Sequence, residues 1–282
     1  MKIYDCFMYY DEDLIIDLRF NILNEYITEF IIVESKFTHS GEKRELLFDI
    51  NKYSKFKKKI NYIVLENEPE NLETIHDKDT PDKKNSKYIM NALKRENFQR
   101  NAITKGLKEV NPDDLILISD VDEIPDLSNL NLESVNDEII LFKQNFYYYK
   151  FNLKLEDLPW LGTKACKYKV LKSPQWLRNV KDKKYPFWRL DVLFSNKKYS
   201  NIKFIENGGW HFSNMKSPAD IEKKMKTYLH HREYDINPLG EEKIKQIIKS
   251  KKSIYNLKAD MKSEKFDGTQ NLKPTDGNEL PN

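Results

Sequence analysis

Two aspartates, Asp120 and Asp122, follow an apolar run at residues 115–119 and precede Pro125. In an extended chain, residues i and i+2 point to the same side. Two like charges placed together are costly unless a cation neutralises them, and oxygen ligands favour Mg²⁺ or Mn²⁺. The spacing therefore predicts a divalent metal site, and Asp120, which is closer to the sheet, is also free to reach the ribose of a bound nucleotide or a metal-bound water. A solvated acidic turn is the alternative.

A second motif places Gly208, Gly209 and Trp210 directly before His211. The two glycines would allow a ligand to approach the backbone closely. Trp210 would contact the same ligand, a bound nucleotide. An imidazole suits Mn²⁺ as a third ligand, so we expect Asp120, Asp122 and His211 to hold the metal. A core histidine is the alternative interpretation of His211.

A third motif lies on an expected helix that carries Arg95, Gln99 and Arg100. Arg95 and Gln99 share one helix face at i, i+4, and Glu96 and Arg100 share the next. We expect these side chains to reach the phosphates or the nucleoside of a bound nucleotide. Surface ion pairing is the alternative.

The bulk composition limits the classes of function. Lys and Arg number 48 against 45 Asp and Glu, which gives a net charge of +3 and does not indicate a nucleic-acid partner. Cys6 and Cys166 form neither a disulfide framework nor a metal-ligand spacing. The sequence contains no run of about 18 apolar residues and no signal-peptide pattern. We therefore expect no transmembrane segment and a cytoplasmic location.

The first 120 residues alternate strand and helix patterns, which positions these motifs. Strands separated by helices predict a mainly parallel sheet, and α/β folds bind ligands at the carboxyl ends of such strands. A polar stretch over residues 66–87 is expected to be a mobile loop. We expect strands over residues 3–10, 30–35, 59–65 and 115–119, and helices over residues 13–28 and 88–110.

The pattern changes after Pro125, where strand patterns follow one another with few helices between them. A smaller, mixed or antiparallel sheet is the natural interpretation. Ser217 as N-cap and Pro218 at the first helical position open a helix. We expect strands over residues 139–144, 146–153, 164–171, 189–195 and 201–206, helices over residues 217–232 and 241–255, and a loosely packed polar tail over residues 259–282.

With these motifs in this order, the chain resembles glycosyltransferase family 17 over roughly residues 1–235. The resemblance implies an α/β GT-A fold, with a Rossmann-like nucleotide-binding half and a smaller mixed acceptor-side sheet. We expect one catalytic domain over residues 1–258, divided into a nucleotide-sugar-binding half (1–125) and an acceptor-side half (126–258). The matching stretches are residues 3–7, 30–35 with 38–41, 95–100, 117–125 and 209–213.

The resemblance also implies a UDP-sugar donor, UDP-GlcNAc in the characterised animal members, a divalent metal and inversion at the anomeric carbon. Animal members carry an N-terminal membrane anchor, whereas this sequence begins at the catalytic domain. Its Lys/Asn/Ile-rich composition suggests a microbial or viral cytoplasmic enzyme. The N-glycan acceptor of the animal enzymes is therefore not carried over, and the expected acceptor is a glycan or glycoconjugate.

The expected reaction is a single displacement. Arg95, Arg100 or Arg189 would add positive charge at the donor phosphates, and Glu34, with the loop at residues 38–41, would line the nucleoside pocket.

An acceptor hydroxyl needs a general base within hydrogen-bond reach. Glu123, Asp191 and Glu206 are the candidates, and Asp191 is preferred because it lies in the acceptor-side half.

Two other classes of protein fit parts of this pattern. A HAD-like phosphohydrolase also has a nucleophilic Asp in a D-x-D after an apolar strand, but normally with Thr or Val where this chain has Ile124, and nearer the N-terminus. Inhibition of a phosphatase activity by vanadate would favour it. A non-catalytic nucleotide- or sugar-binding module would bind UDP without turning over UDP-sugars.

Overall fold

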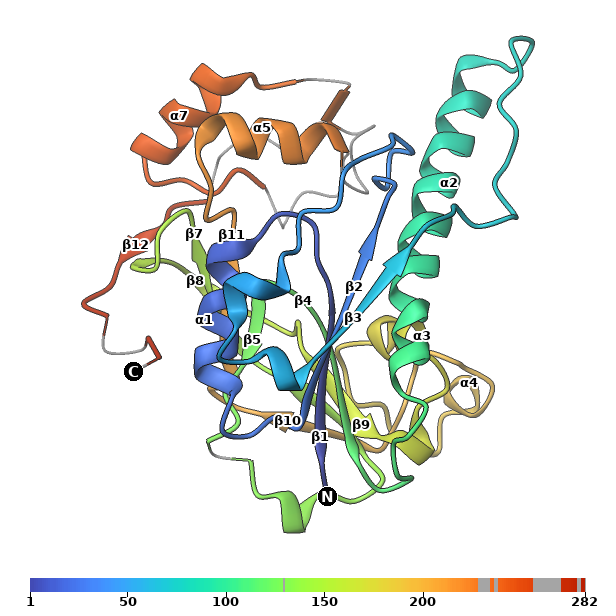
Figure 1. The fold of residues 1–282 in the computed structure, drawn as a ribbon, viewed down its shortest axis with the longest axis vertical. Coiled ribbons are helices and arrows are strands. Elements are labelled where there is room, and N and C mark those ends of the chain that lie inside the picture. Colours follow the sequence, from blue (N-terminus) through green and yellow to red (C-terminus); the bar gives the residue numbers. More distant parts are fainter. Residues whose placement is uncertain (129, 228–233, 236–237, 256–269, 278–279, 282) are drawn as a thin grey trace.

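The computed structural model describes residues 1–128, 130–227, 234–235, 238–255, 270–277 and 280–281. Two β-sheets and their flanking helices make up an α/β fold, as expected, and one of the sheets is mostly parallel (Figure 1).

The larger sheet has seven strands in the order β10-β6-β9-β4-β1-β2-β3. The four strands of its β4-β1-β2-β3 side are parallel, and only β9 runs against its neighbours β4 and β6. The carboxyl ends of β1, β2 and β4 therefore meet at one edge. The strands are β1 Ile3–Met8, β2 Glu29–Ser35, β3 Ile60–Leu65, β4 Leu115–Asp120, β6 Ile139–Phe142, β9 Lys164–Lys167 and β10 Ile202–Ile205.

Alternate residues of these strands enter two separate cores, as the two-residue period of a strand requires. Phe7 and Leu117 face α1 (Asp13–Leu23), and Cys6 and Ile118 face α3 (Pro174–Asn179) and the 3₁₀ turn after α2. Both faces of the sheet are thus covered, which explains why its central strands β1, β2 and β4 are largely apolar.

The smaller sheet has the order β12-β8-β7-β11-β5 and is mixed, since β11 runs parallel to β7 while the other pairs are antiparallel. Its outer face packs against α5 (Pro218–Thr227) and α7 (Glu241–Lys249) through buried Ile221, Met225 and Ile244. The strands are β5 Glu123–Pro125, β7 Gln144–Tyr148, β8 Leu153–Trp160, β11 Gly209–Ser213 and β12 Lys273–Pro274.

The remaining helices are short, apart from α2. These are α2 Pro81–Asn101, α4 Leu190–Leu193 and the 3₁₀ turns Ile50–Tyr53, Lys57–Lys59, Ala102–Gly106, Leu132–Ser134 and Tyr168–Val170.

Several expectations about the elements need correction. Residues 189–195 do not form a strand: they contain the short helix α4, and Leu190 and Phe194 point outward without a neighbouring strand to cover them. The helix expected from residue 88 begins at Pro81, because the Thr80 side chain accepts a hydrogen bond from Lys83 N. The stretch at residues 66–87 is therefore partly helical.

The two sheets do not correspond to the two halves of the chain that we expected to meet at residue 125. β6, β9 and β10 come from the second half of the chain and extend the larger sheet. In the tail, Leu272 is buried and β12 pairs with β8, so this part of the tail is attached to the smaller sheet although most of its side chains are partly or fully exposed. Residues 228–232 of the expected helix and residues 259–269 of the tail lie outside the described residues.

Candidate active site

A cavity of about 400 Å³ lies at the carboxyl ends of β1, β2 and β4, where an α/β sheet is expected to bind a ligand. This volume is within the range of small-molecule sites. Side chains from α2, β11 and α5 complete the wall. The polar and aromatic lining includes Tyr10, Glu12, Thr38, His39, Arg44, Glu96, Gln99, Arg100, Asp120, Asp122, Glu123, Trp160, His211, Asn214, Lys224, Thr227 and Tyr255.

The turn that carries both aspartates is fixed by hydrogen bonds from Arg19, a fully buried residue of α1. Its Nη1 donates hydrogen bonds to the carbonyl oxygens of Asp120, Val121 and Glu123 at 3.2, 3.1 and 2.9 Å. Its Nε and Nη2 donate to the two carboxylate oxygens of buried Asp5 at 2.7 and 2.5 Å. A buried, bidentate ion pair of this kind is rigid, so the direction of the turn is fixed by α1 and β1.

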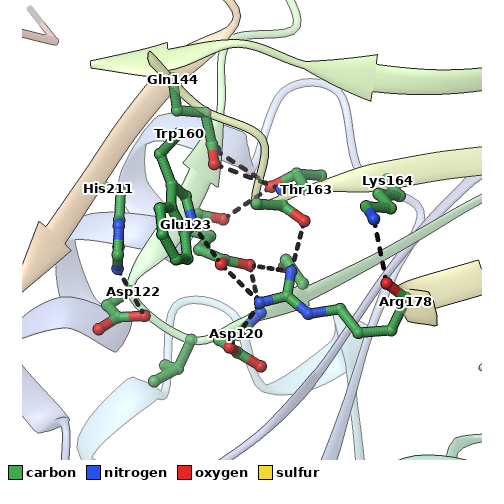
Figure 2. Close-up of polar contacts among 12 residues, drawn as sticks. Asp120, Asp122, Glu123, Gln144, Trp160, Thr163, Lys164, Arg178 and His211 are labelled. Carbon is green, nitrogen blue, oxygen red and sulfur yellow. Dashed lines mark hydrogen bonds and ion pairs between the residues drawn. The ribbon is translucent and has the colours of Figure 1, made fainter. Parts of the chain in front are cut away.

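Asp120 lies between two guanidinium groups. Its Oδ1 is 2.9 Å from Nη2 of Arg100. Its Oδ2 is 2.7 Å from Nη2 of Arg178 (Figure 2). Burial alone would raise the pKa of this carboxyl, but Arg178 and Arg100 outweigh it and hold the pKa well below its usual range. The negative charge of Asp120 is therefore already matched by protein groups.

Glu123 is fully buried next to Asp120, and all of its hydrogen-bonding capacity faces the protein. It accepts bonds from Trp160 Nε1 at 2.6 Å, from both Nη atoms of Arg178 at 2.7 Å, and from Asp120 N at 2.8 Å (Figure 2). These four donors, two of which are nitrogens of the Arg178 guanidinium, occupy the lone pairs of the carboxylate oxygens. Glu123 therefore anchors Arg178 and is poorly suited to remove a proton from a substrate.

Asp122 faces His211 rather than the arginines. Its Oδ1 lies 3.6 Å from His211 Nε2 across the β5–β11 pair (Figure 2). Asp122 O also accepts a hydrogen bond from Phe212 N. Burial opposes ionisation of Asp122, but His211 and then Lys224 favour it, so the pKa of Asp122 is lowered. The two side chains therefore form a separate polar pair beside Asp120.

The Asp122–His211 pair fits a divalent ion in part. A separation of 3.6 Å is too long for a hydrogen bond but shorter than two metal–ligand bonds of about 2.1 Å each, so one ion can touch both atoms. Among the described residues, no group of three or more His, Cys, Asp and Glu side chains is arranged to hold an ion alone. Mg²⁺ commonly takes one or two carboxylates and completes its shell with substrate phosphates and water, which this pair allows.

Glu12 and Lys224 are among the charged residues of the cavity that the sequence reasoning missed. Glu12, between β1 and α1, accepts hydrogen bonds at Oε2 from Tyr10 N and Asp11 N, both at 3.0 Å. Burial raises its pKa more than nearby Lys216 and Lys224 lower it. Burial disfavours the charged form of Lys224, yet Asp122 and Glu12 raise its pKa overall. The position of Glu12 in the short connection between the first strand and the first helix was the available signal.

Asn214 adds an unpartnered polar group to the same wall. It is 2% exposed, and neither Oδ1 nor Nδ2 has a hydrogen-bond partner among the described residues. Asn214, Glu12, Asp122 and Lys224 also line an adjoining cavity of about 120 Å³. Buried amides are normally satisfied, so this corner is suited to the hydroxyl groups of a ligand.

The structure brings six of the residues proposed from sequence to this one cavity, from four separate elements. These are Gln99, Arg100, Asp120, Asp122, Glu123 and His211. Gln99 acts through its neighbours, donating to Val33 O at 3.0 Å and bonding His39 at 3.1 Å. Burial lowers the pKa of His39, so at neutral pH this imidazole is uncharged.

Three proposed donor-binding residues lie near the cavity without lining it. Glu34 is fully buried and accepts hydrogen bonds from Leu47 N and Phe48 N, which fixes a neighbouring loop. Arg95 pairs with Glu68 at 2.5 Å. Trp210 packs against the core beneath the larger sheet.

Asp191, Arg189 and Glu206 do not join the site. Asp191 and Arg189 are exposed and pair with each other at 2.9 Å on α4, because the segment expected as a strand is a surface turn of helix. Glu206 is exposed and pairs with Lys143 at 2.5 Å. The carboxylates available to an acceptor are therefore those of the cavity wall.

The two glycines before His211 serve packing rather than ligand approach. A Cβ on Gly209, which has φ +118°, would lie 2.2 Å from Ile124 O, and one on Gly208 would lie 2.8 Å from Ile205 O. Neither glycine lines the cavity. They let β11 approach its neighbours closely, which places His211 beside Asp122.

Comparison with known proteins gives two findings. The family model described as Glycosyltransferase family 17 matches residues 1–267. The human and rat proteins named beta-1,4-mannosyl-glycoprotein 4-beta-N-acetylglucosaminyltransferase are each 27% identical over 115 residues, which is 39% of this chain and 19% of each relative. The matched region is therefore less than two thirds of those relatives. Within the described residues, the structure has no helix long and apolar enough to cross a membrane.

Proposed function

The chain belongs to glycosyltransferase family 17, and we propose that it transfers N-acetylglucosamine from UDP-N-acetylglucosamine to a hydroxyl of a glycan or glycoconjugate, with Mn²⁺ or Mg²⁺ as cofactor. One observation carries the proposal: the Asp122–His211 pair lies beside an arginine-neutralised Asp120 in a cavity at the carboxyl edge of a mostly parallel sheet. The relatives named above are N-acetylglucosaminyltransferases, which supports the choice of sugar.

The charge distribution of the cavity supports a nucleotide diphosphate as ligand. Arg100 bonds Asp120, Lys224 lies near Asp122, and both line the cavity, where they would attract phosphate oxygens. Asp120, fixed between Arg100 and Arg178, would accept hydrogen bonds from the donor ribose. The neutral His39, held by Gln99, would face the nucleoside.

Asp122 and His211 would hold the divalent ion, with the donor diphosphate and water completing its shell. When bound, the ion would act as a Lewis acid that stabilises the charge on the departing diphosphate. The protein's own contribution is to aim the two ligands. Arg19 fixes the Asp122 turn, and stacking with Phe146 and Trp160 fixes the imidazole of His211.

In the proposed displacement, the acceptor oxygen attacks the anomeric carbon while the bond from that carbon to the β-phosphate oxygen breaks. The bonding electrons leave with UDP, and the acceptor proton passes to a carboxylate. We assign that carboxylate to Glu12, in place of Asp191, because it lines the cavity and burial raises its pKa. Asn214 would orient the acceptor through its unpartnered amide.

The experiment that tests the function is a transfer assay. The protein is incubated with UDP-sugars and simple glycan acceptors in Mn²⁺ or in EDTA, and released UDP is measured. UDP release from UDP-N-acetylglucosamine that needs both the ion and Glu12 is the expected result. UDP binding with no release from any UDP-sugar would instead indicate a non-catalytic binding module. The control variant is Asp191→Asn, which alters an exposed carboxylate outside the cavity and should leave release unchanged.

A further inference from the structure

Four large apolar side chains are exposed together on one segment. Phe187, Trp188, Leu190 and Phe194 are 73, 70, 72 and 88% exposed, and we call them the 187–194 patch. Elsewhere among the described residues, no large apolar side chain exceeds the 57% exposure of Leu14. Single exposed apolar residues are ordinary, but a contiguous group of this size marks an interaction surface.

The patch is presented by an ordered segment that is tied down at both ends. Lys181 N donates to Lys197 O at 2.8 Å, and Tyr185 N donates to Tyr199 O at 3.0 Å. Val192 of α4 is buried, so one side of the short helix faces the protein while the aromatic side chains face outward. Phe187 and Trp188 also pack edge to face, with ring centroids 5.2 Å apart. The outward orientation is therefore built into the fold.

Basic residues surround the patch. Between residues 181 and 198 the sequence has six cationic and two acidic side chains. Asp191 is paired with both Arg189 and Lys198, whereas Lys183 and Lys184 are exposed. Aromatic residues rimmed by Lys and Arg are the composition of a surface that lies in the headgroup region of an anionic bilayer.

We propose that the 187–194 patch inserts into the interface of an anionic lipid membrane, with the surrounding lysines on the headgroups. A second copy of the chain is a poorer partner, because a two-fold contact would place each basic rim against itself. An anionic lipid surface satisfies both the apolar centre and the cationic rim. α4 lies beyond α3 and well away from α5 and α7 (Figure 1), and the patch does not line the cavity. The proposal is therefore independent of the proposed transferase activity.

Vesicle flotation with the full chain tests the proposal. The protein is mixed with vesicles of phosphatidylcholine alone or with phosphatidylglycerol added, and the bound fraction is measured at low and high salt. We expect binding to the anionic vesicles that weakens as salt screens the lysines. The emission of exposed Trp188 should move to shorter wavelength on binding, and Trp188→Phe should bind while losing most of that change.

Matched variants test whether vesicle binding depends on the 187–194 patch or on exposed apolar residues in general. Replacing Phe187, Trp188 and Phe194 together by Ser should lower the vesicle partition coefficient by about tenfold or more, since partition follows buried apolar area. The control Leu14→Ser/Leu47→Ser changes two other exposed apolar residues and should bind as wild type. The melting temperature and the far-UV circular dichroism should be equal in all of these proteins, which verifies that they are folded.

A charge variant tests the basic rim. Lys183→Glu/Lys184→Glu should weaken binding to anionic vesicles, while Lys57→Glu/Lys58→Glu, at exposed lysines far along the chain, should not. The proposal is overturned if wild type does not float with anionic vesicles, or if the patch and control variants float alike. It is also overturned if sedimentation shows a dimer that the triple Ser variant abolishes, because the patch then serves self-association.

Discussion

Nη2 of Arg178 lies 2.7 Å from Oδ2 of Asp120, in a site where the sequence suggested that a metal would neutralise that carboxylate. The protein thus supplies the counter-charge itself. The two aspartates of the motif consequently differ in role: Asp120 belongs to a structural ion-pair network, and Asp122 is the carboxylate directed toward His211.

Removing Arg178 should therefore destabilise the fold. Arg178→Met would leave the Asp120 and Glu123 carboxylates close together without their shared cation, and leaving the buried Glu123 carboxylate without its partner costs about 3–5 kcal/mol. Urea unfolding measures the loss. Arg189→Met breaks an exposed pair and should cost only about 0–1 kcal/mol. Equal losses in the two variants would contradict the network.

Stability should fall in acid partly because of Asp120. The pKa of Asp120 in the fold lies below its ordinary value of 3.8, so the folded state binds fewer protons than the unfolded chain. The resulting stabilisation is complete above that ordinary value and is lost as the pH falls below it. Asp120→Asn should flatten the acid side of the stability curve and, by leaving two arginines less well matched, lower stability at neutral pH. An acid limb as steep as that of wild type would count against the network.

The larger sheet was largely predictable, because its buried strands and the polar residues at their ends follow simple periodicity. Asp120 and Asp122 were found for the same reason, because they end an apolar run, and His211 was found from the Gly-Gly-Trp that precedes it. Arg178 was not found from the sequence, because an arginine on a short helix resembles a surface residue. Only the packing of α3 against β4 places it beside the carboxylates. Asp191 lies outside the cavity because the segment that resembled a strand is a short surface helix.

If Glu12 is the general base, its ionisation should set the acid limb of the pH–rate profile. Its pKa is raised above the ordinary value of 4.5, so kcat/KM should increase with pH through a value above 4.5 as the carboxylate forms. Glu12→Gln should lower kcat by a factor of about 10²–10⁴ and remove that limb, while UDP affinity stays near wild type. An unchanged limb in the variant would assign the base elsewhere.

The role of His211 can be separated from a structural one. His211→Ala should weaken the Mn²⁺ dependence of UDP binding, with the Phe146 and Trp160 stacking partners left in place. If His211 only packs, the variant should instead lose stability without metal by about 1–3 kcal/mol and keep its Mn²⁺ response. Thermal melting with and without Mn²⁺ distinguishes the two results.

The most direct test of the account is calorimetric titration of UDP into wild type and Asp122→Asn, each in Mn²⁺ and in EDTA. A wild-type protein whose UDP affinity depends on Mn²⁺, and an Asp122→Asn protein that is folded but binds UDP equally weakly in both buffers, are the predicted results, because an amide neutralises a cation poorly. At UDP about 100-fold above its dissociation constant, wild type should also be stabilised by about 2.7 kcal/mol. Equal wild-type affinity in Mn²⁺ and EDTA, or a folded Asp122→Asn protein that keeps the Mn²⁺ response, would contradict a metal-dependent donor site at Asp122.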